Sequence, residues 1–272
     1  MDPTLAIPVN LKGIAETLLF PLYFRAVETR RQNALFRDPL AVELISRIDY
    51  DFSRLKAYDL LQTAVALRVR EFDRCIQDMI RECPQAAVVN LGCGLDTRFQ
   101  RLDNGSLRWY ELDLPEVIDL RRRFFRQTAR YRFLASSLIE TGWLDELEAS
   151  VESGLIFVAE GLFPYFEERQ LRRVVQNLSR RFPGAVLIFD AVTPLQVELS
   201  RFHPLLRMAG AQLKWGLQSA RDLEHWEGGT RLLYQVYYFD QPEPRLGWYN
   251  ILRLFPYIRY GFSVVAVGLG GS

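Results

Sequence analysis

The sequence predicts an α/β fold in which a mostly parallel sheet carries helices on both faces. Strand-like apolar runs alternate with helix-like runs from residue 85 to about 190, with short connections between them. This alternation is typical of a parallel sheet covered on both faces. The glycine turn Gly92-Cys93-Gly94 directly follows the first run, where a strand is expected to give way to a helix.

Each element of this core has its own signal. The expected strands are 86–91, 107–112, 131–135, 155–159 and 185–189. The runs at 155–159 and 186–189 are continuously apolar, which suits central strands that are buried on both faces. The expected helices between the strands are about 97–101, 116–127, 144–151 and 168–182.

Helices are also expected before and after the core. Asp38-Pro39 supplies an N-cap and a first-turn proline, and a long amphipathic helix over about 58–82 is stopped by Pro84. The last third contains a polar, helical stretch at 194–228. Two further strands are expected there, at 232–239 and 263–269, and we expect them to be antiparallel.

Composition excludes several classes of function. A net charge of +1 leaves no excess of cations for a nucleic-acid surface. The three cysteines and two histidines show no metal-binding spacing and no disulfide framework, so we expect reduced thiols and no metal. No apolar run reaches the roughly 18 residues of a membrane span. The N-terminus also lacks the features of a signal peptide, so we expect a cytoplasmic protein that does not contact membranes.

The glycine turn and the acids after the second strand point to a nucleoside. Gly92 and Gly94 let the backbone approach a ligand closely. Asp113 lies 19 residues beyond Gly94, about the spacing at which a strand-end carboxylate meets a ribose. Glu111 points to the same side of the strand. The pattern predicts an adenosine-type cofactor, although a tight turn and a solvated strand end would explain the same residues structurally.

Other residues favour S-adenosylmethionine over a dinucleotide. Leu95-Asp96-Thr97 follows the turn, so the third glycine that a pyrophosphate requires is absent. Glu160 follows the most apolar strand, where ligands lie in an open α/β sheet, and its carboxylate suits an ammonium group. Arg68 or Arg70 on the long helix would clamp a carboxylate. A turn acid and a solvated helix face are the structural alternatives.

Together these segments resemble the leucine carboxyl methyltransferase superfamily, specifically its tetracenomycin-type polyketide O-methyltransferase branch. The resemblance covers about Gly13 to Asp190. Its specific motifs are Asn90-Leu91-Gly92-Cys93-Gly94-Leu95-Asp96-Thr97-Arg98, Tyr110-Glu111-Leu112-Asp113-Leu114-Pro115 and Ala159-Glu160-Gly161. Weaker matches are Glu16-Thr17-Leu18-Leu19, Phe36-Arg37-Asp38-Pro39 and Arg68-Val69-Arg70-Glu71-Phe72-Asp73.

The resemblance implies a Rossmann-like methyltransferase fold that uses S-adenosylmethionine. Gly92 would then contact the cofactor, Asp113 its ribose, and Glu160 its methionine ammonium group. Arg70, chosen over Arg68, would hold the methionine carboxylate. Ser137 stands where protein-methylating relatives have the acid of an adenine-binding Asp-Leu pair. The full expected cofactor set is Arg68, Arg70, Gly92, Cys93, Gly94, Asp96, Arg98, Glu111, Asp113, Leu114, Ser136, Ser137, Leu138, Glu160 and Gly161.

The implied reaction is a direct displacement at the sulfonium methyl group by an acceptor oxygen. A carboxylate acceptor is ionised near neutral pH and needs no general base, so positioning would supply the catalysis. A phenolic acceptor would need a base, and no histidine is obvious. These points favour a carboxylate, and the resemblance to the polyketide branch implies a small molecule as the acceptor. The candidate acceptor-pocket residues are Tyr23, Arg25, Tyr165 and Arg201.

We expect one domain over residues 1–272. Its parts are a helical cap at 1–84, a cofactor-binding core at 85–192, an insertion or lid at 193–230 and antiparallel strands at 231–272. Three alternative functions remain open: a protein C-terminal carboxyl methyltransferase, a nicotinamide-dependent oxidoreductase and a non-catalytic cofactor-binding protein. The missing third glycine and the lack of a Tyr-x-x-x-Lys pair count against the oxidoreductase.

Overall fold

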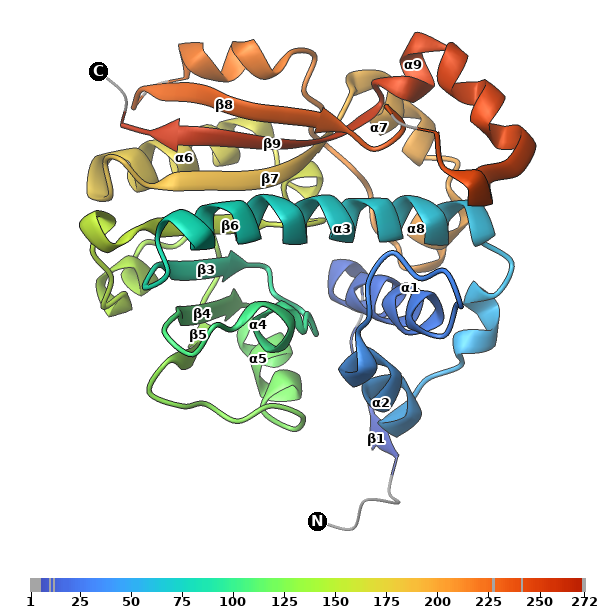
Figure 1. The fold of residues 1–272 in the computed structure, drawn as a ribbon, viewed down its shortest axis with the longest axis horizontal. Coiled ribbons are helices and arrows are strands. Elements are labelled where there is room, and N and C mark those ends of the chain that lie inside the picture. Colours follow the sequence, from blue (N-terminus) through green and yellow to red (C-terminus); the bar gives the residue numbers. More distant parts are fainter. Residues whose placement is uncertain (1–5, 10, 12, 227, 241, 271–272) are drawn as a thin grey trace.

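The computed structural model describes residues 6–9, 11, 13–226, 228–240 and 242–270. Its main strands are β3 (Ala87–Leu91), β4 (Arg108–Asp113), β5 (Tyr131–Ala135), β6 (Leu155–Ala159), β7 (Val186–Val192), β8 (Thr230–Tyr237) and β9 (Phe262–Leu269). Within the described residues they form a seven-stranded sheet in the order β5-β4-β3-β6-β7-β9-β8, with helices on both faces (Figure 1). Strands β3, β4, β5, β6 and β7 pair in parallel, and β9 is antiparallel to its neighbours β7 and β8. The predicted α/β class is confirmed.

The remaining elements surround this sheet. The α-helices are α1 (Leu19–Thr29), α2 (Pro39–Arg47), α3 (Asp59–Glu82), α4 (Arg98–Leu102), α5 (Pro115–Arg121), α6 (Glu168–Arg181), α7 (Pro194–Ser200), α8 (Pro204–Met208) and α9 (Pro256–Arg259). The 3₁₀ turns are η1 (Gly13–Leu18), η2 (Phe52–Leu55), η3 (Gly142–Glu146), η4 (Val151–Ser153), η5 (Phe163–Tyr165), η6 (Ala220–His225) and η7 (Pro244–Leu254). A small parallel pair joins β1 (Ile7–Pro8) to β2 (Ile48–Asp49).

Two apolar cores separate the faces of the sheet. On one face, α3 runs along the sheet, and its Phe72 and Ile76 share a buried cluster with Ile156 of β6 (Figure 1). On the opposite face, Val175 of α6 packs in a second cluster that contains Phe157. Because side chains alternate along a strand, residues such as Ile156 and Phe157 divide between the two cores.

The helical cap follows its sequence signals closely. Asp38 caps α2, since the amide of Ala41 donates to its side chain at 3.0 Å, and Pro39 occupies the first helical position. Helix α3 covers the predicted range to within one residue. The last helix of the cap, α3, therefore lies across one face of the sheet and places its arginines there.

Two of the helices predicted between the core strands differ from the structure. The helix expected over 116–127 ends at Arg121. The helix expected over 144–151 is wrong, since only the short turns η3 and η4 form there. Side chains of β4 form hydrogen bonds with backbone groups of this segment. The amide of Glu148 donates to the Tyr110 hydroxyl at 3.1 Å, and its carbonyl accepts from Arg108. Those groups are therefore not available for helical hydrogen bonds.

The C-terminal region contains two features that the sequence did not predict. Between β8 and β9 lie η7 and α9, in a segment that was expected to contain strands only. Strand β8 also carries a bulge: Leu232 pairs with Val267 while Tyr234 pairs with Ala266, leaving Leu233 as an extra residue.

Candidate active site

The glycine turn after β3 has the conformation that the motif predicts. Gly92 has φ of +66° and Gly94 has φ of +49°, in the left-handed region that favours glycine. A Cβ atom on Gly92 would lie 2.6 Å from a methyl carbon of Leu162. The turn therefore presents backbone without side chains. Gly92 packs so closely on Leu162 that a side chain at Gly92 would displace Leu162.

Asp113 lies beside this turn at the carboxyl end of β4. Its Oδ2 accepts a hydrogen bond from the amide of Gly94 at 2.7 Å, and its Oδ1 accepts one from the amide of Leu114 at 2.8 Å. Burial raises the pKa of this carboxyl to about 6. Each oxygen keeps a second lone pair, so the fixed carboxylate can accept two further hydrogen bonds.

Glu160, at the end of β6, lies between two arginines. Nε of Arg68 contacts its Oε1 at 2.9 Å, and Nη2 of Arg98 contacts its Oε2 at 2.5 Å. Arg98 is 1% exposed and also pairs with Asp73 and Asp96 at 2.6 and 2.5 Å. Arg98 is thus fixed inside the protein, whereas the Arg68 side chain keeps 15% of its surface exposed and is the one that a ligand could reach.

Asp190 belongs to the same cluster, although the sequence analysis did not select it. Its Oδ1 accepts a hydrogen bond of 2.6 Å from the amide of Gly161, and its Oδ2 lies 3.5 Å from Nη1 of Arg68. Burial raises the pKa of this carboxyl. Asp190 follows the apolar run of β7 two residues before the strand ends, whereas Asp113 is the last residue of β4. An acid near the carboxyl end of a parallel strand is the signal that could have found it.

The structure does not bring Arg70 to Glu160. Its Nε and Nη2 contact Glu71 at 3.0 and 2.8 Å. Two positions along an α-helix differ by about 200°, so Arg68 and Arg70 face opposite sides of α3. The preference for Arg70 therefore stays a prediction without a supporting contact, and Arg68 is the arginine placed in the site.

Other predicted cofactor residues support the turn from inside the protein. Glu111 has no exposed surface and binds Arg121 at 2.6 Å and Asn90 at 2.8 Å. Burial raises its pKa to about 7. The Asp96 carboxylate accepts hydrogen bonds from the amides of Thr97 and Arg98 at 2.8 and 3.1 Å. Burial raises the pKa of Asp96, but nearby arginines, chiefly Arg98, outweigh burial and lower it. We interpret these two acids as structural supports of the motif.

The remaining predicted positions surround the carboxyl ends of β3, β4 and β5. The amide of Ser136 donates to the carbonyl of Asp113 at 3.0 Å, while its hydroxyl donates to Glu140 at 2.9 Å. Ser137 is half-buried, and Leu138 is buried. Cys93 is buried in the turn, whereas Leu114 and Gly161 have exposed surface.

Of the four acceptor candidates, only Tyr165 lies near the cluster. Burial raises its pKa, and Arg68 and Asp190 are the charged groups that act on it. Tyr23 stacks on Phe52 with ring centroids 5.5 Å apart. Arg25 is buried and paired with Asp38 at 3.0 Å. Arg201 pairs with Glu198 at 3.2 Å on the surface. The structure therefore does not gather these four residues into one pocket.

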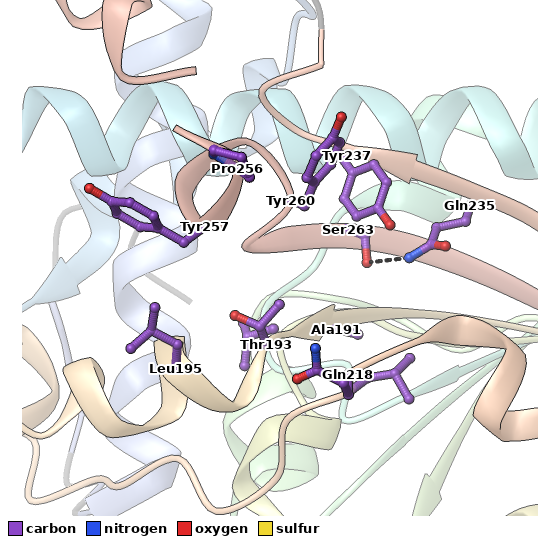
Figure 2. Close-up of a pocket in the computed structure, with 12 residues that line it drawn as sticks. Ala191, Thr193, Leu195, Gln218, Gln235, Tyr237, Pro256, Tyr257, Tyr260 and Ser263 are labelled. Carbon is purple, nitrogen blue, oxygen red and sulfur yellow. Dashed lines mark hydrogen bonds between the residues drawn. The ribbon is translucent and has the colours of Figure 1, made fainter. Parts of the chain in front are cut away.

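A cavity of about 430 Å³ opens beyond the carboxyl end of β7 (Figure 2). Gln235, Tyr237 and Tyr260 contribute to its wall, and the amide of Gln235 donates to the Ser263 hydroxyl at 3.5 Å. None of the described residues that line it is charged. Its lining begins at Ala191, the residue after Asp190, so the cavity lies near the cluster along β7 but on the other face of the sheet, because neighbouring residues of a strand point to opposite faces. Its volume is typical of small-molecule sites.

Within the described ranges, no three His, Cys, Asp or Glu side chains form a group suited to a metal ion. None of the helices described there is both long and apolar enough to cross a membrane.

Comparison with known proteins decides the family. The model of the family described as "Leucine carboxyl methyltransferase" matches residues 19–179, which is more than half of the chain. The chain is also 33% identical to the tetracenomycin polyketide synthesis O-methyltransferase TcmP of Streptomyces glaucescens, over 94% of this chain and 97% of that protein. The chain belongs to the leucine carboxyl methyltransferase family. The predicted resemblance is thereby confirmed.

Other relatives agree with this membership. The S-adenosyl-L-methionine-dependent methyltransferase dpfgK of Gibberella zeae is 29% identical over 91% of this chain and 89% of its own length. The predicted cofactor, S-adenosylmethionine, and the predicted S-adenosylmethionine-dependent O-methyltransferase class are confirmed. The oxidoreductase alternative is therefore set aside.

Solved structures confirm the fold. A candidate methyltransferase from Thermobifida fusca YX superposes with a TM-score of 0.63 at 15% identity, covering 96% of both chains. A DUF574 family protein from Streptomyces avermitilis gives a TM-score of 0.60 at 12% identity, covering 91% of this chain and 96% of its own.

Proposed function

We propose that this methyltransferase transfers the methyl group of S-adenosylmethionine to an oxygen of a small aromatic molecule held in the cavity of Figure 2. The observation that carries the proposal is the uncharged cavity, partly walled by tyrosines, at the carboxyl end of β7, the strand that also carries Asp190 of the cluster with Arg68 and Glu160. Tyrosine rings suit flat aromatic ligands because they offer large apolar faces with a polar edge.

The site residues fit the cofactor. Gly92 and Gly94 leave the backbone of the turn without side chains, so a ligand can approach it closely, and the Asp113 carboxylate has lone pairs for two ribose hydroxyl groups. The charged end of a methionine needs an anion and a cation, which Glu160 and Arg68 supply. We therefore assign the methionine carboxylate to Arg68, in place of Arg70, and the ammonium group to Glu160.

The chain's own contribution to the reaction is placement. When bound, the cofactor supplies an electrophilic methyl group on a sulfonium ion. Arg68, Glu160 and Asp113 would fix the two ends of the cofactor, and the cavity wall would orient the acceptor oxygen toward the methyl group. No histidine, aspartate or glutamate lines the cavity among the described residues. An acceptor that is already ionised, such as a carboxylate, needs no base, and we therefore favour it over a phenol.

A methyl-transfer assay tests the proposal. We expect methylation of aromatic carboxylic acids, weaker methylation of the matched phenols, and none of peptides with a C-terminal leucine. Gln235→Glu places a charge in the cavity, so KM for an acidic acceptor should rise while cofactor affinity stays unchanged. Methylation of the peptide instead would identify a protein carboxyl methyltransferase. Cofactor binding with no transfer to any acceptor would support the non-catalytic alternative.

The proposed location is the cytoplasm. Cys75, Cys83 and Cys93 are all free thiols, as expected in a reducing compartment. Fractionation of the source cells with detection of the protein in the soluble cytoplasmic fraction tests this location.

A further inference from the structure

Tyr238 carries a buried hydroxyl group that the protein itself does not satisfy. The residue directly follows β8 and is 6% exposed. Its amide donates to the carbonyl of Phe262 at 3.1 Å, and its ring stacks on the Phe262 ring with centroids 6.1 Å apart. Among the residues that the structure describes, its hydroxyl oxygen has no hydrogen-bond partner.

An unpaired buried hydroxyl destabilises a folded protein, because it loses its bonds to water and gains none in return. A phenylalanine at this position would fill the same space without that cost. The hydroxyl group is therefore best explained by a partner outside the chain, which binds when the protein works.

The surroundings of Tyr238 identify the chemistry of that partner. The charged groups that act on its hydroxyl are Asp190, Arg68 and Glu160. Burial is the largest cause that raises its pKa well above the usual value, so the group stays protonated and can donate a hydrogen bond. Neither Asp190 nor Glu160 accepts a hydrogen bond from the Tyr238 hydroxyl. A ligand carboxylate paired with Arg68 is the acceptor that this arrangement lacks.

We propose that the Tyr238 hydroxyl donates a hydrogen bond to the carboxylate of the cofactor's methionine moiety, beside the Arg68 guanidinium. The inference rests on the proposed assignment of that carboxylate to Arg68. It makes the C-terminal strand pair part of the cofactor site, although the glycine turn and the acidic strand ends all lie before residue 191. Tyr238 acts as a binding residue that holds one end of the cofactor.

Calorimetric titration of Tyr238→Phe tests the proposal with three probes. S-adenosylmethionine carries the carboxylate, decarboxylated S-adenosylmethionine lacks it, and 5′-methylthioadenosine lacks the whole amino-acid end. A hydrogen bond to a charged group predicts that Tyr238→Phe binds S-adenosylmethionine about tenfold or more weakly. Its affinity for the other two probes should match that of the wild type.

Stability of the ligand-free protein gives a second readout. Loss of an unpaired hydroxyl should leave the Tm of Tyr238→Phe unchanged or raise it, whereas a structural role predicts a lower Tm. Tyr234→Phe is the matched control. Tyr234 lies on β8, four residues before Tyr238, and the charged groups that influence it include Arg74 and Glu71, so the variant should show wild-type binding.

Three outcomes separate the explanations. Unchanged affinity of Tyr238→Phe for S-adenosylmethionine overturns the inference, and so does an equal loss for all three probes. Failure of the wild-type protein to bind S-adenosylmethionine overturns the cofactor site itself, and this result is distinct from a failure of Tyr238 alone.

Discussion

The backbone amide of Gly94 donates a hydrogen bond of 2.7 Å to Oδ2 of Asp113, and this bond joins the turn after β3 to the end of β4. The acid is thereby fixed against the bare backbone on which a cofactor would rest. The bond also links the ionisation of the carboxyl to the geometry of the turn, since only the carboxylate has both oxygens free to accept.

Cofactor affinity should depend on the ionisation of Asp113. Its pKa is raised to about 6, so the carboxylate that accepts ribose hydroxyls is lost as pH falls through that value. We expect wild-type affinity for S-adenosylhomocysteine to fall between pH 7.5 and 5.5. Asp113→Asn should bind at least tenfold more weakly at pH 7.5, with a flatter pH profile. Asp119→Asn, at an exposed acid, is the control, and calorimetry at both pH values decides.

The two arginines of α3 should differ sharply in their effect on binding. Arg68→Ala leaves the methionine carboxylate without its cation and exposes Glu160 and Asp190 to each other, so cofactor affinity should fall by about tenfold or more. Arg70→Ala removes only a contact with Glu71 at the side of the helix away from the site and should bind normally. Equal losses in calorimetric titrations of the two variants would contradict the assignment.

Glu111 should give the ligand-free protein a distinctive pH dependence. Its folded pKa of about 7 exceeds the usual value of 4.5, so its contribution to the free energy of unfolding is fully present below pH 4.5 and lost as pH rises through 7. The loss amounts to about 3 kcal/mol at most. Urea unfolding from pH 5 to 8 should show this decline in the wild type and a flatter profile in Glu111→Gln. Parallel profiles would show that Glu111 does not titrate there.

Arg25 should matter for stability more than for the acceptor. It pairs with Asp38 at 3.0 Å and donates to the carbonyl of Leu95 at 2.8 Å, with both side chains buried. Removing one partner of a buried ion pair costs about 3–5 kcal/mol. We therefore expect a clear loss in the urea midpoint of Arg25→Ala. Unchanged stability together with a raised acceptor KM would restore the acceptor role that the sequence suggested.

The sequence predicted the features that depend on local pattern alone. The glycines, the acids at the ends of β4 and β6, and the order of strands and helices follow from local pattern, and the structure contains them. Partners were harder to predict. Arg68 and Arg70 differ only in the face of the helix they occupy, and that face is set by how α3 packs on the sheet.

The cavity and Tyr238 depend on contacts that are distant in sequence. Asp190 and Tyr238 are 48 positions apart in the numbering and come near each other because β7 and the end of β8 both pair with β9. The helical segment between β8 and β9 likewise lacks a strong periodic signal, yet it supplies Tyr257 and Tyr260 to the cavity. Such contributions follow from topology and cannot be obtained from spacing alone.

The extra residue in β8 determines which of Tyr237 and Tyr238 faces the cavity and which faces the charged cluster. If the strand ran straight from Leu232, alternation would turn Tyr237 toward Arg68 and Tyr238 toward the cavity. The bulge at Leu233 reverses this phase, so Tyr237 lines the cavity and Tyr238 turns toward the charged cluster. Loss of the bulge residue would preserve that assignment, whereas loss of Val236 would exchange the two hydroxyl groups. The number of residues in the strand thus governs how the two tyrosine hydroxyl groups are divided between the faces of the sheet.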